Sequence, residues 1–225
     1  MYTRTRALLG DEKLEKLISS KVLVVGLGGV GGYAAEALAR AGIGTLGLCD
    51  FDVVDITNKN RQLLALDSTI GLHKAQVSAA RIADINPDCH TEVFDMKLTE
   101  ETLDVLHLKD WDFVVDAVDD VSAKLLLIQK CGEYGIPMIS SMGTGNKMDP
   151  SRFRVCDIDE TEGDPLARSM RKKLRKMEIS GVKVLFSDEP PVHPGKRPIP
   201  TISYMPAVAG LNLAAYAIKK ILENM

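Results

Sequence analysis

The chain has 225 residues, a net charge of −3, 45% hydrophobic residues and 26% charged residues. This composition is ordinary for a soluble globular protein, so the chain can bury a core without disulfides or a structural metal. The acidic balance argues against general attraction to nucleic acid but leaves room for a local basic patch. Because the N-terminal segment lacks the apolar core of a signal peptide, we expect a cytoplasmic protein.

Short apolar runs alternate with helical patterns along the first two thirds of the chain. The expected strands are KVLVVG (21–26), TLGLCD (45–50), TEVFDM (91–96), DFVVDAV (112–118) and PMISSM (137–142). The expected helices cover 30–42, 73–86, 99–108 and 122–134. This alternation predicts an α/β fold with a doubly wound, mostly parallel sheet of the Rossmann-like kind.

After Pro150 the composition changes. RFRVCDI (152–158) and VKVLFS (182–187) predict two more strands around a charged helix, and a proline-rich loop follows at 188–201. The apolar run 205–218 is too short to span a bilayer and predicts an amphipathic helix. One face of that helix would carry Leu211, Ala215, Ile218 and Leu222. We expect one domain, 1–225, with a nucleotide-binding core (1–150) and a mixed strand and helix extension (151–225) that faces the substrate.

A glycine-rich loop follows the first strand and opens the first long helix. Gly26, Gly28 and Gly31 satisfy G-x-G-x-x-G in the context that this fingerprint requires. Gly26 permits a tight turn, Gly28 lets a phosphate approach the backbone, and Gly31 lets helix and strand pack closely. Asp50 follows the second strand, where an acid can bind ribose hydroxyls. These residues alone fit NAD and ATP equally well.

Polar residues beyond the second strand favour ATP. Arg61 can bind phosphate oxygens with its forked guanidinium, and Lys74, with Asn58 nearby, can place a point charge on them. Asp119 follows the fourth strand, where a carboxylate can hold Mg²⁺ against the phosphates. Any one of these residues alone would be ordinary solvated surface. Their positions at successive strand ends predict a shared catalytic site for a triphosphate.

Four motifs carry a family resemblance: GLGGVGG, DFDVVDITNKNRQ, GLHK and DAVDD. They resemble the ubiquitin-activating-enzyme superfamily, which includes the adenylating enzymes of thiamine and molybdopterin biosynthesis. The resemblance implies that Gly29 lies against the phosphates, that Asp50 binds ribose, and that Asn58, Arg61 and Lys74 contact the triphosphate. It also implies that Asp119 lies beside Mg²⁺. Arg4 resembles an arginine that reaches across a homodimer to the ATP of the neighbouring subunit.

Within this superfamily, SSMGTGNKMDPSRFRVCDI (140–158) and DPLARSMRKKLRK (164–176) resemble the tRNA threonylcarbamoyladenosine dehydratases. The resemblance implies ATP-dependent activation of the carboxylate of threonylcarbamoyladenosine in tRNA, followed by ring closure and release of AMP and pyrophosphate. Alternatives are adenylation of the C-terminus of a ubiquitin-like sulfur-carrier protein, a NAD-dependent oxidoreductase, and a non-catalytic nucleotide-binding adaptor.

The charged helix after Pro150 is the expected tRNA contact. Asp164 is placed as its N-cap and Pro165 as its first residue. Its apolar face would carry Leu166, Met170, Leu174 and Met177. Its exposed cations would be Arg168, Arg171, Lys172, Lys173, Arg175 and Lys176. This concentration of positive charge predicts binding to the tRNA backbone.

The segment SMGTGNK (141–147) is the expected position of the substrate carboxylate. Gly143 would let the substrate approach the backbone, and Thr144 and Asn146 would orient the carboxylate. An ordinary turn explains the glycines almost as well.

Four cysteines, at positions 49, 89, 131 and 156, show no C-x-x-C spacing. The sequence therefore gives no sign of a structural zinc site. The alternating pattern around Cys156 favours a strand residue over a catalytic thiol. The sequence leaves open whether a sulfur-transfer partner takes part.

Overall fold

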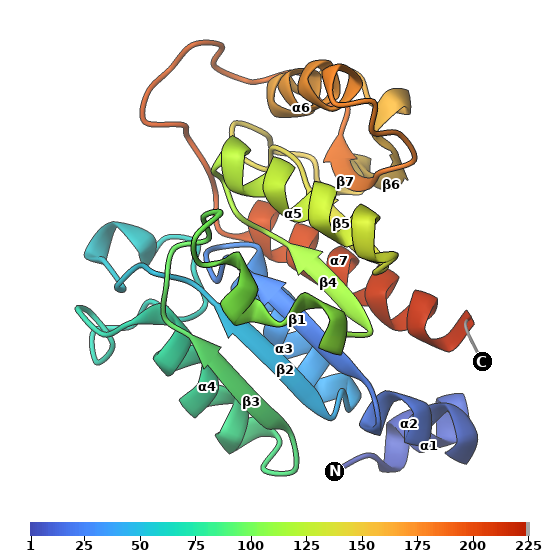
Figure 1. The fold of residues 1–225 in the computed structure, drawn as a ribbon. Helices are drawn as coiled ribbons and strands as arrows, with labels where there is room; N and C mark the ends of the chain where they lie inside the picture. Colours follow the sequence, from blue (N-terminus) through green and yellow to red (C-terminus); the bar gives the residue numbers. More distant parts are fainter. Residues whose placement is uncertain (224–225) are drawn as a thin grey trace.

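A single mixed sheet organises the protein in the computed structural model, which describes residues 1–223 (Figure 1). Its strands are β1 (Lys21–Val25), β2 (Thr45–Cys49), β3 (His90–Phe94), β4 (Phe113–Asp116), β5 (Met138–Ser141), β6 (Phe153–Asp157) and β7 (Lys183–Ser187). The strand order is β3-β2-β1-β4-β5-β7-β6, and every neighbouring pair is parallel except the edge pair β6–β7. The predicted fold class, a doubly wound and mostly parallel α/β sheet, is confirmed.

Helices cover both faces of this sheet (Figure 1). They are α1 (Thr3–Leu9), α2 (Asp11–Ile18), α3 (Gly31–Ala41), α4 (Lys74–Ile85), α5 (Val121–Tyr134), α6 (Pro165–Lys176) and α7 (Tyr204–Glu223). One apolar cluster joins α3, α4 and α7 to one face of the sheet. Two others join α5 and α6 to the opposite face. Central strands covered on both sides must be apolar throughout, which is why KVLVV forms β1 with its last four residues buried.

The sheet reverses its strand order between β1 and β4. From β1 the chain runs outward through β2 and β3, and after the crossover to β4 it runs outward in the other direction. Ligands of such sheets bind in the crevice outside the carboxyl ends of the strands at this switch point. The glycine loop follows β1, so the topology places it at that crevice.

The helix predicted over 99–108 is wrong. The chain forms two short 3₁₀ turns there, η2 (Leu103–Leu106) and η3 (Leu108–Asp110). His107 lies between them in the left-handed region, with φ of 45°, and this conformation interrupts any continuous α-helix. The leucines still cover the sheet together with Trp111. The spacing of these leucines resembles the period of an α-helix, which is why the sequence predicted one here.

The face predicted for the C-terminal helix is also wrong. In α7 the buried residues include Ala209, Leu213, Ala217 and Ile221, whereas Leu211 is 50% exposed. Small residues determine which face is buried, because a Cβ on Gly210 would overlap the backbone at the start of α3. Two rows of this helix are apolar, so periodicity alone could not select the correct one. Within residues 1–223, no helix is long and apolar enough to cross a membrane.

The segments after Pro150 extend the same sheet. β7 pairs with β5 through Ser140↔Val184 and Ser141↔Leu185, and β6 lies outside it. The predicted cap of α6 is confirmed, because the Asp164 side chain accepts a hydrogen bond from the Ala167 amide and Pro165 is the first residue. Of the predicted apolar face, Met170 and Leu174 are buried, Leu166 is half-buried, and Met177 is 37% exposed at the helix end.

We predict that Gly31→Ala destabilises the protein by about 3 kcal/mol, because its methyl group would overlap the Gly26 carbonyl oxygen. The matched control is Gly32→Ala, one residue further along α3. A methyl group there meets its nearest atom at 3.5 Å, which is ordinary contact. The control should be neutral or stabilise the helix by up to about 1 kcal/mol. Urea unfolding of both variants measures the difference, and equal stabilities would contradict this packing argument.

Candidate active site

The glycine loop is open at Gly28 but not at Gly29, where a Cβ would lie 3.0 Å from the Pro206 side chain of α7. A Cβ on Gly26, whose φ is 87°, would lie 2.7 Å from the Ala117 carbonyl oxygen, and one on Gly31 would overlap Gly26 itself. The loop is therefore wedged between β1 and the end of β4 in a conformation that glycine favours. At Gly28 the nearest atom to a Cβ would be Gln62 Nε2 at 3.7 Å. Backbone amides at a helix start suit a phosphate, and Gly28 is where this loop is open to one.

Asp50 braces this loop from the end of β2. Its Oδ2 accepts a hydrogen bond from the Leu27 amide at 2.6 Å, and its Oδ1 accepts one from the Asp52 amide at 2.8 Å. Burial raises the pKa of this carboxyl, while the two amides and the Lys74 ammonium act in the opposite direction. Each carboxylate oxygen has a second lone pair, so these bonds leave room for a ribose hydroxyl. The ribose role stays a prediction.

Arg61 lies beside the loop. Its Cγ is 3.5 Å from the position of a Cβ on Gly29. Its Nη1 donates to the Thr57 carbonyl at 3.0 Å and to Asn60 Oδ1 at 2.9 Å. Within residues 1–223, no carboxylate forms an ion pair with it. A guanidinium has five N–H groups, so donors remain for phosphate oxygens.

Asn58 is buried in the turn η1 (Ile56–Asn58), three residues before Arg61. Its Oδ1 accepts a hydrogen bond from the Asp55 amide at 3.1 Å, and the Asp55 side chain caps the same turn. In this arrangement Asn58 shapes the segment that carries Arg61. Its predicted contact with the triphosphate stays a prediction.

Lys74 begins α4 and is only 4% exposed. Its Nζ lies 2.7 Å from Asp52 Oδ2, and its backbone amide donates to the Asp52 carbonyl at 3.0 Å. These two contacts hold the ammonium beside the turn that follows β2, where it partly offsets the rise that burial causes in the pKa of Asp50. The Asp52 side chain is 48% exposed, so the acid that holds the lysine is open to solvent. Lys74 is therefore a buried cation at the edge of the crevice, and its partner acid, Asp52, can be reached from solvent.

Asp119 lies in the loop after β4, two residues beyond the Ala117 carbonyl that packs on Gly26. The preceding acid, Asp116, is fully buried and pairs with Lys124 at 3.0 Å, whereas Asp119 is exposed. Within residues 1–223, no group of three or more Asp, Glu, His or Cys side chains could form a protein-only metal site. Mg²⁺ is commonly held by one or two carboxylates together with phosphate oxygens and waters, so a lone exposed carboxylate fits a metal that arrives with the nucleotide.

Gln62 is a candidate that sequence reasoning missed. It is 9% exposed, and its Oε1 is buried without a hydrogen-bond partner among the described residues. Its amide faces the backbone of Gly28. The Nε2 group of this amide is the one that lies beside the loop, and it can donate a hydrogen bond to a phosphate oxygen. The available signal was its position directly after Arg61 in the same motif.

The segment 141–147, which was predicted to bind the substrate carboxylate, already forms contacts within the protein. The Asn146 amide forms two bonds with the backbone of His193, one from Nδ2 to the carbonyl oxygen and one from the His193 amide to Oδ1, both at 2.8 Å. Asn146 therefore fastens this loop to the proline-rich segment. A Cβ on Gly143 would lie 2.8 Å from Asp164 Oδ2, and Thr144 is half-buried. Their roles toward the substrate stay predictions.

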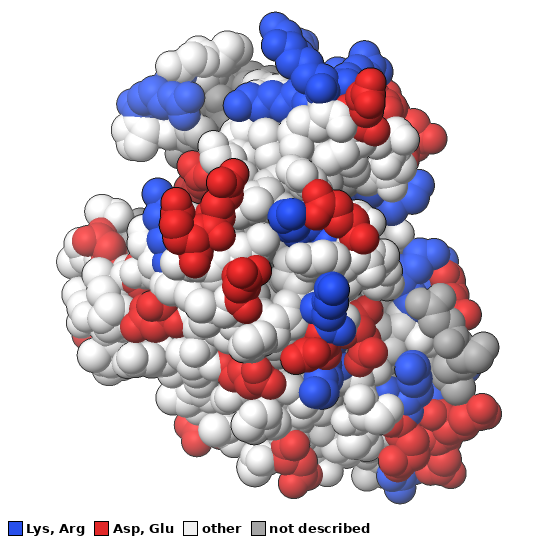
Figure 2. Space-filling view, viewed as in Figure 1, with Lys and Arg blue, Asp and Glu red and all other residues white. Residues whose placement is uncertain are grey.

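The cations of α6 divide into two groups. Arg171 donates to Thr161, and Arg175 pairs with Asp159 at 2.7 Å, so both brace the helix against the turn before it. The other cations are exposed and have no carboxylate partner within residues 1–223: Arg168, Lys172, Lys173 and Lys176. Figure 2 shows Lys and Arg side chains gathered over the end of the molecule where α6 lies. This surface is available to an anionic partner.

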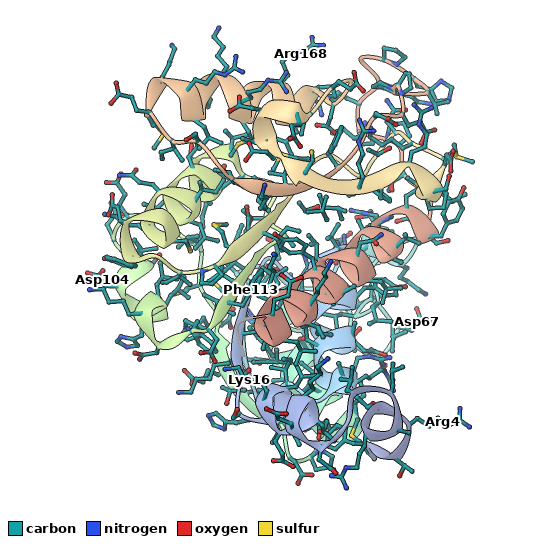
Figure 3. The ribbon with its side chains drawn as sticks, turned by 90° about the vertical axis from the view of Figure 1, so that its right-hand side faces the viewer. Arg4, Lys16, Asp67, Asp104, Phe113 and Arg168 are labelled. Carbon is teal, nitrogen blue, oxygen red and sulfur yellow. The ribbon has the colours of Figure 1, made fainter. Side chains whose placement is uncertain are left out.

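Arg4 lies far from the glycine loop of its own chain. Tyr2 contacts Gly42, which ends α3, whereas the glycine loop begins that helix. The 11 residues of α3 separate the two ends by about 16 Å. Figure 3 shows Arg4 at the outer edge, at the opposite end of the molecule from Arg168. The structure does not bring Arg4 to its own site, and a role in a neighbouring subunit stays a prediction.

The cysteines are poor nucleophiles. Burial raises the pKa of Cys49 and of Cys131 to about 12 and that of Cys89 to about 11. Cys156 is half-buried in β6, which confirms the predicted strand position, and burial raises its pKa as well. Because the thiolate is the reactive form, none of the four has an activated thiol.

Comparisons with known proteins agree with this geometry. The model of the ThiF family matches residues 2–225. The chain is 43% identical to the tRNA threonylcarbamoyladenosine dehydratase of Bacillus subtilis (strain 168), over 100% of this chain and 95% of the relative. It is 40% identical to the enzyme of the same name from Escherichia coli (strain K12), over 84% of this chain and 74% of the relative.

A solved structure is also similar. The Escherichia coli tRNA N6-threonylcarbamoyladenosine dehydratase in complex with ATP superposes with a TM-score of 0.93 and 36% identity, covering 99% of this chain and 94% of that one. Sequence, fold and site thus lead to one conclusion: this chain belongs to the ThiF family.

Proposed function

We propose that this protein uses ATP to activate the carboxylate of threonylcarbamoyladenosine in tRNA and then closes it to a cyclic form. A carboxylate oxygen attacks the α-phosphorus of ATP and pyrophosphate leaves. A nucleophile within the same modified nucleoside then attacks the activated carbonyl carbon, and AMP leaves. The observation that carries this proposal is the glycine loop, open at Gly28 and flanked by Arg61 and Lys74, which suits a triphosphate.

Several groups of this chain would bind and orient the nucleotide. The amides at the start of α3 face the phosphates, and Asp50 faces the ribose. Arg61 and Lys74 offset the negative charge that develops as pyrophosphate leaves. Asp119 would hold Mg²⁺, which neutralises charge on the phosphates when it is bound.

Ring closure needs no protein thiol. The nucleophile is tethered to the activated carboxyl, so the second step gains from a high effective concentration. This agrees with four cysteines whose pKa values are raised by burial. A sulfur-carrier substrate, the alternative, would still be compatible with the first step. A sulfur-transfer partner is not needed for either step.

The two parts of the chain would bind different parts of the substrates, the nucleotide and the tRNA. We propose that 1–150 holds the nucleotide and that 151–225 faces tRNA through the four cations of α6 that have no carboxylate partner in the described part of the chain. Their charge would attach to the phosphate backbone without reading bases. A chain that acts on tRNA would work in the cytoplasm.

A homodimer would complete the site. Six apolar residues between β2 and α4 are 40–63% exposed: Phe51, Val53, Ile56, Leu66, Ile70 and Leu72. Exposed apolar patches of this kind commonly mark protein interfaces. Helix α1 has no buried residue in the single chain, which suits a segment that packs on a neighbour. We propose that two copies meet there and that each supplies Arg4 to the other.

AMP release on modified tRNA tests the proposed reaction. With ATP, Mg²⁺ and tRNA that carries threonylcarbamoyladenosine, the wild-type protein should release AMP and pyrophosphate. Arg61→Ala and Lys74→Met should each lower kcat/KM by about 10²- to 10³-fold, because each removes a charge that stabilises the transition state. Lys59→Met is the control, since Lys59 lies in the same segment and pairs with Asp67 at 2.7 Å. Adenylylation of a sulfur-carrier protein without AMP release on tRNA would instead support the alternative.

Charge reversal on α6 should weaken tRNA binding. The double change Lys172→Glu with Lys173→Glu should also reduce the salt dependence of binding, because both cations lose their contacts with phosphates. ATP binding should not change. The control carries the same charge change elsewhere, as Lys13→Glu with Lys219→Glu on α2 and α7. Filter binding over a range of salt concentrations measures the slopes, and equal slopes for the two double variants would argue against α6 as the contact.

Arg4 should act on the site of the neighbouring subunit. Arg4→Ala and Lys74→Met should each lose most activity alone. Mixed and reassembled, they should regain activity, because the Arg4→Ala subunit keeps an otherwise intact site that its partner can complete. Steady-state AMP release measures this recovery. A mixture that stays inactive, although sedimentation shows mixed dimers, would exclude action across the interface.

A further inference from the structure

The loop after β5 is clamped at both ends. Met142 is 3% exposed, and its amide donates to the Leu185 carbonyl at 2.8 Å. Lys147 is also 3% exposed, while the four residues between them, 143–146, are half-buried. Residues 143–146 therefore lie next to the crevice between two buried residues, Met142 and Lys147. The segment is also held from within, because Asn146 forms hydrogen bonds with the backbone of His193 and Pro200.

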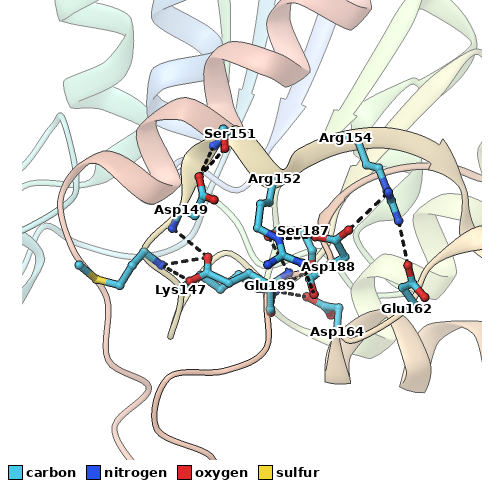
Figure 4. Close-up of polar contacts among 11 residues, drawn as sticks. Lys147, Asp149, Ser151, Arg152, Arg154, Glu162, Asp164, Ser187, Asp188 and Glu189 are labelled. Atoms are coloured by element: carbon cyan, nitrogen blue, oxygen red, sulfur yellow. Dashed lines mark hydrogen bonds and ion pairs between the residues drawn. The ribbon is translucent and has the colours of Figure 1, made fainter.

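Lys147 holds the second end through its ammonium. Nζ donates to the Ser187 carbonyl at 2.7 Å and to the Glu189 carbonyl at 2.8 Å (Figure 4). It also lies 3.8 Å from Asp164 Oδ2. Three segments that are distant in sequence thus meet at one buried cation: the loop after β5, the exit of β7 and the start of α6.

Asp164 faces this ammonium from the N-terminus of α6. Its Oδ1 caps the helix by accepting from the Ala167 amide at 2.7 Å. Its Oδ2 is buried and has no hydrogen-bond partner among the described residues. Burial raises the pKa of this carboxyl and lowers the pKa of the Lys147 ammonium. Each charge therefore depends on the other, because an unpaired buried charge is costly.

Neighbouring contacts are more exposed. The Glu189 carboxylate accepts from the amides of Met148 and Asp149 at 2.9–3.0 Å, and Arg152 pairs with Asp188 at 2.6 Å. Exposed pairs of this kind contribute little, because water can replace them. Water cannot easily replace the buried contacts of Lys147. We therefore expect Lys147 to have the largest effect on how the second end of the loop is held, since the side-chain bonds of Asn146 to His193 are exposed.

We propose that Lys147 is a positioning residue for the tRNA substrate. Through its contacts with Ser187, Glu189 and Asp164, it fixes the half-buried segment 143–146 relative to α6. The modified nucleoside, which binds at this segment, and the tRNA backbone, which binds at α6, would then be held at a fixed distance and orientation. This inference rests on the proposed function. Lys147 itself is buried beneath the segment and does not touch the substrate. ATP binds at the other side of the crevice, beside the glycine loop, and does not depend on it.

The test compares Lys147→Met with Lys147→Met/Asp164→Asn. The single variant keeps the length of the side chain but loses the carbonyl contacts and leaves Asp164 without a cation, so it should lose stability. The double variant removes both charges and keeps a helix cap, because Asn caps as well as Asp. It should regain much of the stability. Lys183→Met, which changes an exposed lysine on β7, is the control.

The expected result is a rise in KM for the modified tRNA of about 10- to 100-fold in both variants, since misplacement of a substrate loop is costly. ATP affinity should stay near the wild-type value, and the double variant should melt at a higher temperature than the single variant. If the double variant recovers full activity together with its stability, Lys147 acts only through stability and the inference is wrong. If the wild-type protein releases no AMP on modified tRNA, the proposed function fails instead.

Discussion

The close contact between Gly31 and the Gly26 carbonyl governs the shape of this site. Because neither residue has a side chain, α3 can begin directly against the end of β1, and Ala117 at the end of β4 closes the third side. Asp50 then fixes the loop through the Leu27 amide. These contacts point the start of α3 into the crevice at the switch between β1 and β4, where the sheet topology already directs a ligand.

Much of this arrangement could be predicted from the sequence. Buried central strands are continuous apolar runs, and glycines at fixed spacing can be recognised because few other residues fit there. The failures have physical causes. A left-handed residue, His107, divided the expected helix at 99–108 into two 3₁₀ turns, and the small residues of α7 selected a different face from the one expected. Neither backbone conformation nor interhelical contact is visible in periodicity.

The hydrogen-bond partners of the candidate site residues could not be predicted from the sequence. The sequence placed Asn146 and Arg171 among the substrate contacts, but the structure gives the Asn146 amide to the His193 backbone and the Arg171 guanidinium to Thr161. It also leaves the Oε1 of Gln62 without a partner among the described residues, while the Nε2 of the same side chain lies beside Gly28. A residue type shows what a side chain can bind. Only the fold shows whether that capacity is already used.

Three lysines are buried in the described part of the chain, and all lie near carboxyl ends of strands: Lys74, Lys124 and Lys147. Their partners differ in exposure. Asp116, which pairs with Lys124, is fully buried, so that pair is closed and serves the framework. Asp52, which pairs with Lys74, is 48% exposed, so a charged ligand can reach this pair from solvent. The accessibility of the partner acid, rather than the burial of the lysine, therefore separates a cation that can bind the nucleotide from one that holds the protein together.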